Sequence, residues 1–342
     1  MSDIEPAVSV LMPCYNSAGT LHAALESLSS QTLTNFEVIA VDDGSTDDSL
    51  QILQVWARRD GRFRLVYQTH SGIIVALNAG LRSCRASYVA RMDTDDAAHP
   101  ERLARQVAFL DAHPETAVVG CRVAGFPEGQ VRQGFRIYLD WLNSLVEDAD
   151  IRREIFVESP LAHPSVTFRR EWVERVGGYQ EHGWPEDYDL WLRLYLAGAR
   201  FAKLPEVLLE WREHVGRLTR TDGRYALENF LRAKAHYLSR GPLAGRPAVI
   251  IWGAGMTGRR LSKHLLRQGV PLAAFVDIDP RKIGRVCRNL PVISPEELPG
   301  WWRRFANGAV LAAVGSRGAR QLIRQRLTDM SLREGHDWWS VA

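Results

Sequence analysis

Short apolar runs alternate with amphipathic segments along about the first 125 residues, and this alternation constrains the fold more than any other feature. The apolar runs are rich in β-branched residues, as strands are, whereas the segments between them repeat apolar residues with a helical period. The helical segments are residues 17–30, 46–59, 73–83 and 100–112, and the strand-like runs are AVSVLMP, FEVIAVDD, FRLVYQ, SYVARMD and TAVVGCRVAGF. This pattern predicts βαβ units and therefore an α/β fold with a mostly parallel sheet.

At 342 residues the chain is longer than a single hydrophobic core usually organises, so two domains are expected. A helical apolar spacing near residues 223–240 is followed by RGPLAGRP, whose glycines and prolines are typical of a linker. We therefore predict a first domain at residues 1–240 and a smaller Rossmann-like α/β domain at residues 246–342.

Composition removes several classes of protein. The 4 cysteines are far apart in the sequence and form no CxxC pair, so neither a zinc site nor a disulfide framework is indicated. The first residues lack the basic and apolar pattern of a leader, and no long uninterrupted apolar run follows. We therefore expect a cytoplasmic protein, and the near balance of 43 basic and 40 acidic residues gives no reason to expect nucleic acid as a partner.

Polar clusters follow three of the strand-like runs: PCYN the first, DDGSTD the second and DTDD the fourth. Ligands of open α/β sheets bind at the carboxyl ends of the strands, which is where these clusters fall. Asp93, Asp95 and Asp96 lie within four positions and would repel one another unless a cation compensates. Mg²⁺ or Mn²⁺ would bind such carboxylates. The alternative is that one aspartate caps the helix that begins near Pro100 while the others face water.

The run VDDGSTDDS carries Asp42 and Asp43 at the predicted end of a strand. Two carboxylates there could accept hydrogen bonds from the ring N–H and the ribose hydroxyls of a nucleoside. The alternative is an ordinary Asp-Gly turn followed by a helix N-cap, which accounts for the turn residues but not for two adjacent acids.

With these motifs in place, roughly the first 220 residues resemble the inverting glycosyltransferases of family 2, which have the GT-A fold. The resemblance runs through eight ordered motifs: PCYN (13–16), VDDGSTD (41–47), SGIIVALNAG (71–80), MDTDD (92–96), HPSVTFRR (163–170), VGGY (176–179), PEDYDLWLRL (185–194) and EWREHVGRLTR (210–220). The motif DTDD looks like the DxD element of the family, whose later aspartate binds a metal that holds the diphosphate of a nucleotide-sugar.

The resemblance implies roles for individual residues of the donor site. The positions that hold the nucleoside correspond to Pro13, Tyr15, Asn16, Asp42 and Asp43. By the same resemblance Asp93 approaches the ribose, Asp95 binds the metal, and Asp96 is a third candidate ligand.

An acidic pair in PEDYDLWLRL supplies the base in the family, so the resemblance makes Asp187 the general base and Glu186 its neighbour. Without the resemblance, two acids in the first turn of a helix are explained by the helix dipole. The motif EWREH places His214 as a metal ligand and Arg212 as a cation that supports the diphosphate. A histidine that is merely exposed in a loop is the alternative for His214.

In the predicted second domain, a strand leads into Gly253-x-Gly255-x-x-Gly258, followed by a helix and by a second strand that ends at Asp277. This order is typical of a Rossmann-like fold, in which such an acid contacts ribose hydroxyls. The segment also resembles the small nucleotide-binding-like domain of some sugar-modifying proteins. The same glycines permit tight packing of strand on helix without a ligand, so a nucleotide in this domain and a purely structural loop both stay open.

Together these features predict a metal-dependent inverting glycosyltransferase with a UDP-sugar as the expected donor and a glycan or lipid-linked acceptor. The QxxRW signature of processive polysaccharide synthases is absent from the sequence, which favours transfer of single sugars. A lipid-linked acceptor would bring the protein to the inner face of the cytoplasmic membrane as a peripheral protein. The alternative function is a nucleotide-binding or sensing protein that keeps the transferase domain as an inactive scaffold.

Overall fold

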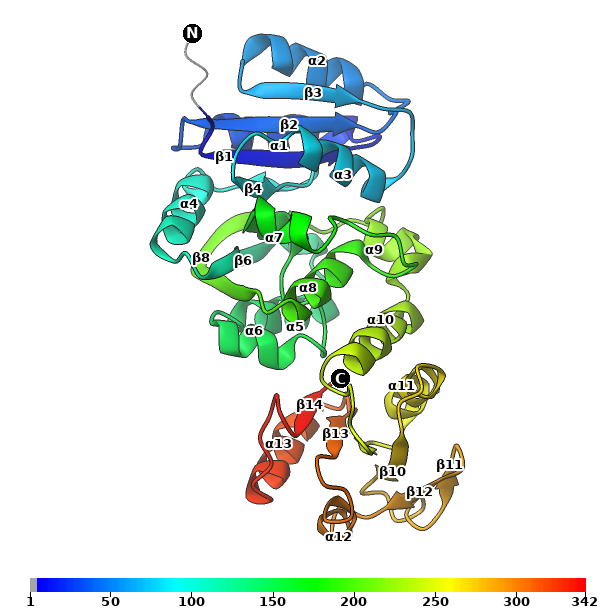
Figure 1. Cartoon of the computed structure of the whole chain (residues 1–342). Helices are drawn as coiled ribbons and strands as arrows, with labels where there is room; N and C mark the ends of the chain where they lie inside the picture. The colour runs from blue at the N-terminus through cyan, green and yellow to red at the C-terminus, as the bar shows by residue number, and fades with distance from the viewer. Residues whose placement is uncertain (1–4) are drawn as a thin grey trace. The chain divides into compact units, whose positions relative to one another are not determined.

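The computed structural model describes residues 5–342, and the chain divides into two compact units (Figure 1). The first unit comprises the chain up to residue 151 together with residues 160–182 and 186–221; the second comprises residues 152–159, 183–185 and 222–342. The boundary that the sequence predicts between residues 240 and 246 falls inside the second unit, in which α10 (Leu227–Arg240) packs against α11 (Met256–Arg267). The domain limits stay a prediction.

The first unit is built on a sheet of eight strands in the order β3-β2-β1-β4-β7-β6-β8-β5. The strands are β1 (Val8–Cys14), β2 (Phe36–Asp42), β3 (Phe63–Tyr67), β4 (Tyr88–Arg91), β5 (Ala97–Ala98), β6 (Thr116–Phe126), β7 (Thr167–Arg169) and β8 (Arg200–Arg212). The four strands β3, β2, β1 and β4 are parallel, and β6 and β8 form a further parallel pair, whereas β5 and β7 run antiparallel to their neighbours. The α/β fold with a mostly parallel first half is as the sequence predicts.

Helices of the first unit connect these strands, as the alternation in the sequence requires. They are α1 (Ala18–Ser29), α2 (Ser49–Arg59), α3 (Ile73–Ser83), α4 (Arg102–Ala112), α5 (Gln133–Ser144), α6 (Asp148–Glu154, whose last three residues belong to the second unit), α7 (Arg170–Arg175), α8 (Glu186–Leu196) and α9 (Leu218–Thr221). Strand β2 is buried along its whole length, because helices cover both faces of a parallel sheet. Nowhere in residues 5–342 is a helix long and apolar enough to cross a bilayer.

Strand β1 lies between β2 and β4, and all three run in the same direction. Their carboxyl ends therefore lie at one edge of the sheet, which we call the first-sheet edge. It carries the segments PCYN, DDGSTD and DTDD, as the sequence predicts. The topology thus gathers three polar segments that are far apart in the sequence.

The second unit contains a sheet of six strands in the order β11-β12-β10-β9-β13-β14, parallel except for β11. Its remaining elements are β9 (Val249–Trp252), β10 (Leu272–Val276), β11 (Val286–Cys287), β12 (Leu290–Ile293), α12 (Leu298–Trp302), β13 (Ala309–Ala312), α13 (Ala319–Asp329) and β14 (Trp338–Ser340). An apolar core between strands and helices includes Ile250, Val276, Leu327 and Trp338. The parallel sheet with β9 at its centre is Rossmann-like, as predicted.

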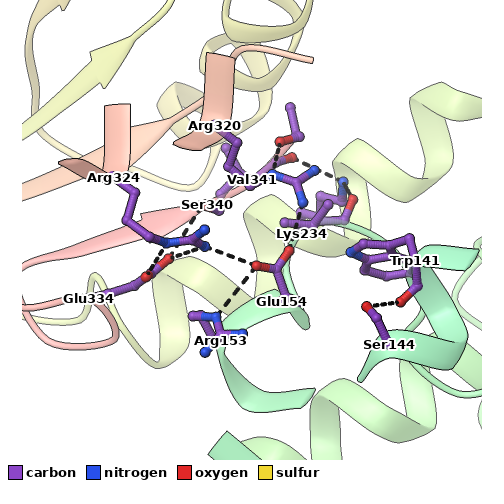
Figure 2. A network of polar contacts seen from close by, with 12 residues as sticks. Trp141, Ser144, Arg153, Glu154, Lys234, Arg320, Arg324, Glu334, Ser340 and Val341 are labelled. Carbon is purple, nitrogen blue, oxygen red and sulfur yellow. Dashed lines mark hydrogen bonds and ion pairs between the residues drawn. The ribbon is translucent and has the colours of Figure 1, made fainter. Parts of the chain in front are cut away.

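A polar network ties residues 152–159 into the second unit, although the chain on both sides of this segment belongs to the first (Figure 2). The buried carboxylate of Glu154 accepts hydrogen bonds from Arg320 at 2.8 Å and Arg324 at 3.0 Å, and Arg324 also pairs with Glu334. The buried ammonium group of Lys234 donates to the carbonyl oxygens of Val157 and Val341. The second unit is therefore assembled from segments that are distant in sequence.

Candidate active site

Three carboxylates lie together directly after β4, at the first-sheet edge. One oxygen atom from each of Asp93, Asp95 and Asp96 lies within 4.8 Å of the other two, which is close enough for a single ion to bind all three. Oxygen ligands at this spacing suit a hard divalent cation such as Mg²⁺ or Mn²⁺. The structure therefore brings the three aspartates of DTDD together, and their role as metal ligands stays a prediction.

Asp96 has hydrogen-bonding capacity that its own chain does not use. Its side chain is 2% exposed; Oδ1 accepts a hydrogen bond from the backbone N–H of Arg212 at 2.8 Å, whereas Oδ2 has no partner within the part of the chain that the structure describes. Burial raises the pKa of Asp96 well above its usual value, and the charges of Asp95 and Asp93 raise it further. A cation would relieve both effects, so this donor set fits a metal ion.

Asp95 is a half-buried member of the same cluster. Its Oδ2 lies 2.8 Å from Nε2 of His214, and burial followed by the charge of Asp93 raises the pKa of Asp95. His214 follows β8. The short pairing of β8 with β5 brings this end of β8 close to the segment that follows β4. The structure thus places His214 beside Asp95 of the aspartate cluster, and its role as a metal ligand stays a prediction.

Arg212, at the end of β8, contacts the segment that carries Asp95 and Asp96. Its backbone N–H donates to Asp96, its Nε donates to the backbone oxygen of Asp95 at 2.6 Å, and its guanidinium lies 4.5 Å from the ring centre of Phe126. The predicted role of Arg212 as a cation for the diphosphate stays a prediction. In the structure it also fixes the backbone that carries the acids.

The segment PCYN lines the neighbouring part of the first-sheet edge. The ring of Tyr15, 44% exposed, stacks on the ring of His70 with a centroid distance of 4.0 Å and an interplanar angle of 21°. Asn16 joins the first two loops, because its Oδ1 accepts a hydrogen bond from Thr46 N at 2.8 Å. Pro13 pairs with Val41 in the register of β1 and β2. An exposed aromatic face of this kind can stack on a nucleobase, which is consistent with the predicted nucleoside site.

Most carboxylate oxygens of the two acids at the end of β2 already accept hydrogen bonds from other groups of the chain. In Asp43, Oδ1 accepts from Ser71 N at 2.9 Å and from Gln68 Nε2, while Oδ2 accepts from Gly72 N at 2.9 Å and lies 2.9 Å from Nδ1 of His70. Asp42 is fully buried; its Oδ2 accepts from Ser45 N. The two aspartates order the loops beneath the Tyr15 ring, and direct contact of either with a nucleoside stays a prediction.

The acidic pair begins α8, as the motif PEDYDLWLRL predicts. Glu186 is 2% exposed, whereas Asp187 is half-buried and its Oδ1 accepts a hydrogen bond from Tyr188 N at 2.7 Å. Leu190, Trp191 and Leu194 are fully buried and anchor the helix. Because Asp187 is the more accessible carboxylate, it is the better placed of the two to take a proton from a substrate hydroxyl.

Two residues of this site were not predicted from the sequence. Arg91 closes β4 with a buried side chain whose Nη2 lies 2.6 Å from Oδ1 of Asp93, and His70 stacks on Tyr15 while bonding Asp43. A signal for Arg91 was present, since an arginine in an otherwise apolar strand is expected to pair with a nearby acid. His70 carries no comparable signal, because an isolated histidine in a polar loop is ordinary.

The glycine-rich loop of the second unit lies between β9 and α11, as predicted. A Cβ on Gly258 would approach the carbonyl oxygen of Gly253 to 1.9 Å, so this glycine is required for packing, whereas a Cβ on Gly255 would meet no atom within 4 Å. Asp277 accepts hydrogen bonds from Ala254 N and from the backbone N–H two residues later, both at 2.9 Å, and pairs with Lys282 at 3.0 Å. A nucleotide on this loop stays a prediction.

Comparison with known proteins supports the assignment of the first unit. The family model described as "Glycosyl transferase family 2" matches residues 9–182. The amylovoran biosynthesis glycosyltransferase AmsE of Erwinia amylovora is 37% identical over 207 residues, which are 60% of this chain and 75% of AmsE.

A second relative is the UDP-Gal:alpha-D-GlcNAc-diphosphoundecaprenol beta-1,3-galactosyltransferase of Escherichia coli, 29% identical over 241 residues, or 69% of this chain and 85% of that protein. Among solved structures, TarS of S. aureus in complex with UDP-GlcNAc superposes with a TM-score of 0.57 at 21% identity, covering 78% of this chain and 72% of that one, and it supports the fold. The chain is a glycosyltransferase and belongs to glycosyl transferase family 2.

Proposed function

We propose that the protein is a metal-dependent, inverting glycosyltransferase that moves a sugar from a nucleoside diphosphate donor, with UDP as the expected nucleotide, to an acceptor hydroxyl. The observation that carries the proposal is the cluster of Asp93, Asp95 and Asp96, with one buried carboxylate oxygen that has no partner among the described residues. Such a cluster is costly for the fold unless it has a ligand.

In this proposal each residue of the first-sheet edge contacts a different part of the donor. The exposed ring of Tyr15, backed by His70, stacks on the nucleobase, and Asp93 accepts hydrogen bonds from ribose hydroxyls. Asp95, Asp96 and His214 would hold Mg²⁺ or Mn²⁺, which when bound neutralises charge on the diphosphate leaving group.

Inversion needs a single displacement. The acceptor oxygen attacks the anomeric carbon, the bond from that carbon to the diphosphate oxygen breaks on the opposite face, and the hydroxyl proton passes to a carboxylate. Asp187 serves as this general base because it is the more accessible member of the α8 pair, while Glu186 beside it orients the acceptor. One base suffices because no covalent intermediate is formed.

The acceptor is proposed to be a hydroxyl of a glycan or of a lipid-linked saccharide. The names of two relatives support this class, since one acts in amylovoran biosynthesis and the other on a GlcNAc-diphosphoundecaprenol. A lipid-linked acceptor would place the protein peripherally at the inner face of the cytoplasmic membrane. The alternative of a nucleotide sensor led by the second unit is less favoured, because Asp277 is engaged with its own loop.

A panel of UDP-, GDP- and dTDP-sugars tests the proposal, with thermal unfolding measured in the presence of Mn²⁺ or of EDTA. We expect one donor class to raise the melting temperature only with Mn²⁺, by an amount equivalent to about 2.7 kcal/mol at a ligand concentration of about 100 times Kd. The best donor is then tested for transfer to glycan acceptors, with the anomeric configuration read by NMR. Retention of configuration, or equal stabilisation in EDTA, would contradict the proposal.

A further inference from the structure

A three-residue stretch of the second unit leads directly into the acidic pair that begins α8. The chain belongs to the first unit up to residue 182 and again from Glu186, whereas Gly183, Trp184 and Pro185 between them belong to the second unit. The chain therefore passes through the second unit immediately before the two carboxylates that include the proposed base.

The side chain of Trp184 packs on α10. Trp184 is 6% exposed, and its ring centre lies 5.3 Å from that of His236 and 6.3 Å from that of Tyr237, with interplanar angles of 52° and 76°. The guanidinium of Arg232 lies 5.6 Å from the ring centre of Trp184. Tilted and edge-to-face pairs with ring centres about 4.5–7 Å apart are the favoured arrangements of aromatic side chains. Residues from two successive turns of α10 thus interact with one tryptophan.

Helix α10 is itself well anchored within the second unit. The buried ammonium group of Lys234 donates to the carbonyl oxygens of Val341 (Figure 2) and Val157. In the first turn of α10, Oε1 of Glu228 lies 2.8 Å from Nε2 of His264 in α11. The helix is therefore a firm support for the ring of Trp184.

The backbone between Trp184 and the acids has little freedom. The ring of Pro185 fixes its φ at about −65°, and a proline disfavours the helical region for the residue before it, which is Trp184. On the other side of the tryptophan, Gly183 has a φ of +74°, a value that residues with a Cβ rarely adopt. The position of the Trp184 ring is thus passed to Glu186 across two restricted residues.

The first turn of α8 depends on the residues that precede it. The first N–H groups of a helix have no intrahelical partner, so this turn frays more easily than the rest. The buried side chains of Trp191 and Leu194 anchor α8 farther along, whereas Asp187 lies in the first turn and is half-buried. A displacement of about 1 Å of a catalytic group can reduce the rate by about 100-fold, so the position of this turn matters for a general base.

We propose that Trp184 is a positioning residue, which by packing on α10 fixes the first turn of α8 and with it the carboxylate of Asp187. The inference rests on the proposed function and gives the second unit a part in the reaction that requires no ligand on its glycine-rich loop. In this role Trp184 need not touch the donor or the acceptor. It acts through Pro185 and Glu186.

Kinetics of Trp184→Leu and Trp184→Phe in the full chain test the proposal, at a temperature at which all variants are folded. We expect Trp184→Leu to lower kcat by about 10- to 100-fold and to leave the donor KM within about twofold of the wild type, because the base moves while the donor site does not. Trp184→Phe should recover most of kcat, since it keeps an aromatic ring on α10.

Trp56 of α2 provides a matched control. It is 4% exposed, its ring centre lies 5.5 Å from that of Phe63, and the guanidinium of Arg59 lies 5.0 Å from it. Trp56→Leu should lower the melting temperature as Trp184→Leu does, with kcat and the donor KM within about twofold of the wild type.

A variant of α10 tests the same contact from the other side. His236→Leu should reproduce part of the loss in kcat, and its effect should be smaller when Trp184→Leu is already present, because residues in contact are not additive. His236 is only half-buried, so this variant preserves the test if Trp184→Leu is unstable. Equal effects of His236→Leu with and without Trp184→Leu would contradict the proposal.

Hydrogen exchange separates this proposal from the proposed function. The backbone amides of residues 186–190 should exchange about 10-fold faster or more in Trp184→Leu than in the wild type, and at the wild-type rate in Trp56→Leu. Mass spectrometry of peptides measures this without any activity, so failure of the wild type to transfer sugar would refute the proposed function alone. Unchanged exchange at residues 186–190, or kinetics of Trp184→Leu that match Trp56→Leu, would overturn the role of Trp184.

Discussion

The protein contains two mostly parallel sheets, and the acids at their carboxyl edges differ in how far the rest of the chain satisfies them. At the first-sheet edge, Asp95 and Asp96 have raised pKa values and one oxygen of Asp96 is without a partner among the described residues. At the corresponding edge of the second sheet, Asp277 accepts two backbone hydrogen bonds and pairs with Lys282. Both edges carry a motif that suggests a nucleotide.

A motif indicates where a ligand can bind. A buried polar atom without a partner indicates where the folded chain needs a ligand. Buried polar groups are nearly always satisfied in native proteins, so an exception needs a reason. At the first-sheet edge Asp96 is such an exception, and Asp277 at the second edge is not. We therefore expect changes at the first edge to affect chemistry and changes at the second to affect stability.

The largest expected effect is on the chemical step, at the acidic pair that begins α8. Replacing Asp187 by Asn removes the proposed base while keeping the size of the side chain and its acceptor for Tyr188 N. We expect kcat to fall by about 10²- to 10⁴-fold, the usual contribution of a general base, with the melting temperature and the donor affinity little changed. Steady-state transfer assays and calorimetry with UDP check this. A variant that retains more than a tenth of kcat would mean that another group takes the proton.

Matched substitutions at the two edges test whether the first edge alone serves the reaction. Asp95→Asn should reduce transfer by about 100-fold or more and abolish stabilisation by Mn²⁺ and UDP, because it removes a charged ligand of the ion. Asp277→Asn should leave the kcat and the donor KM within about twofold of the wild type and lower the stability, since it weakens the pairing with Lys282. Equal losses of transfer in both variants would show that the second edge also serves the reaction.

Two glycines of the second edge distinguish a role in packing from a role in ligand binding. Gly258→Ala places a methyl group 1.9 Å from the Gly253 carbonyl oxygen, so we expect a loss of about 1–3 kcal/mol or more in the unfolding free energy. Gly255→Ala meets open space at a backbone φ of −80° and should change stability by less than about 1 kcal/mol. Urea unfolding of both variants gives these values. Loss of nucleotide binding in Gly255→Ala, with stability intact, would show that a ligand occupies the loop.

Much of the fold could be predicted because the local patterns agree with the global topology. The helical period at residues 73–83 coincides with α3, and the three polar segments meet at one edge because parallel neighbours β2, β1 and β4 end there. The antiparallel strands β5 and β7 were not predicted, since strands of two or three residues carry almost no periodic signal. Tertiary packing decides such short pairs.

In the site, too, local motifs identify candidate residues, whereas the partners of these residues depend on the tertiary fold. Asp93, Asp95, Asp96 and His214 could be selected from motifs, and the structure brings them together. The state of Asp43 and Asp277 could not be predicted, because their partners are backbone N–H groups and side chains whose positions depend on the folded loops. Sequence thus identifies candidate acids, and only the folded loops show which of them are already satisfied.

The smallest expected effect concerns the stability of the ion-free protein and its dependence on pH. The folded-state pKa of Asp96 is raised above the unfolded value of about 3.9, so the folded state binds more protons than the unfolded state between these two values. Stability should therefore fall as the pH rises through this window and stay level above it. Urea unfolding in EDTA from pH 4 upward measures this slope.

Asp96→Asn removes the charge but keeps an oxygen that can accept from the Arg212 N–H. In EDTA at neutral pH the variant should be more stable than the wild type, and its stability should depend less on pH, because the buried charge and its repulsion from Asp95 and Asp93 are gone. In Mn²⁺ the order should reverse, since the wild type gains an ion that the variant binds weakly. A variant less stable than the wild type in both solutions would mean that the first edge is satisfied without a cation, and the contrast between the two sheets would disappear.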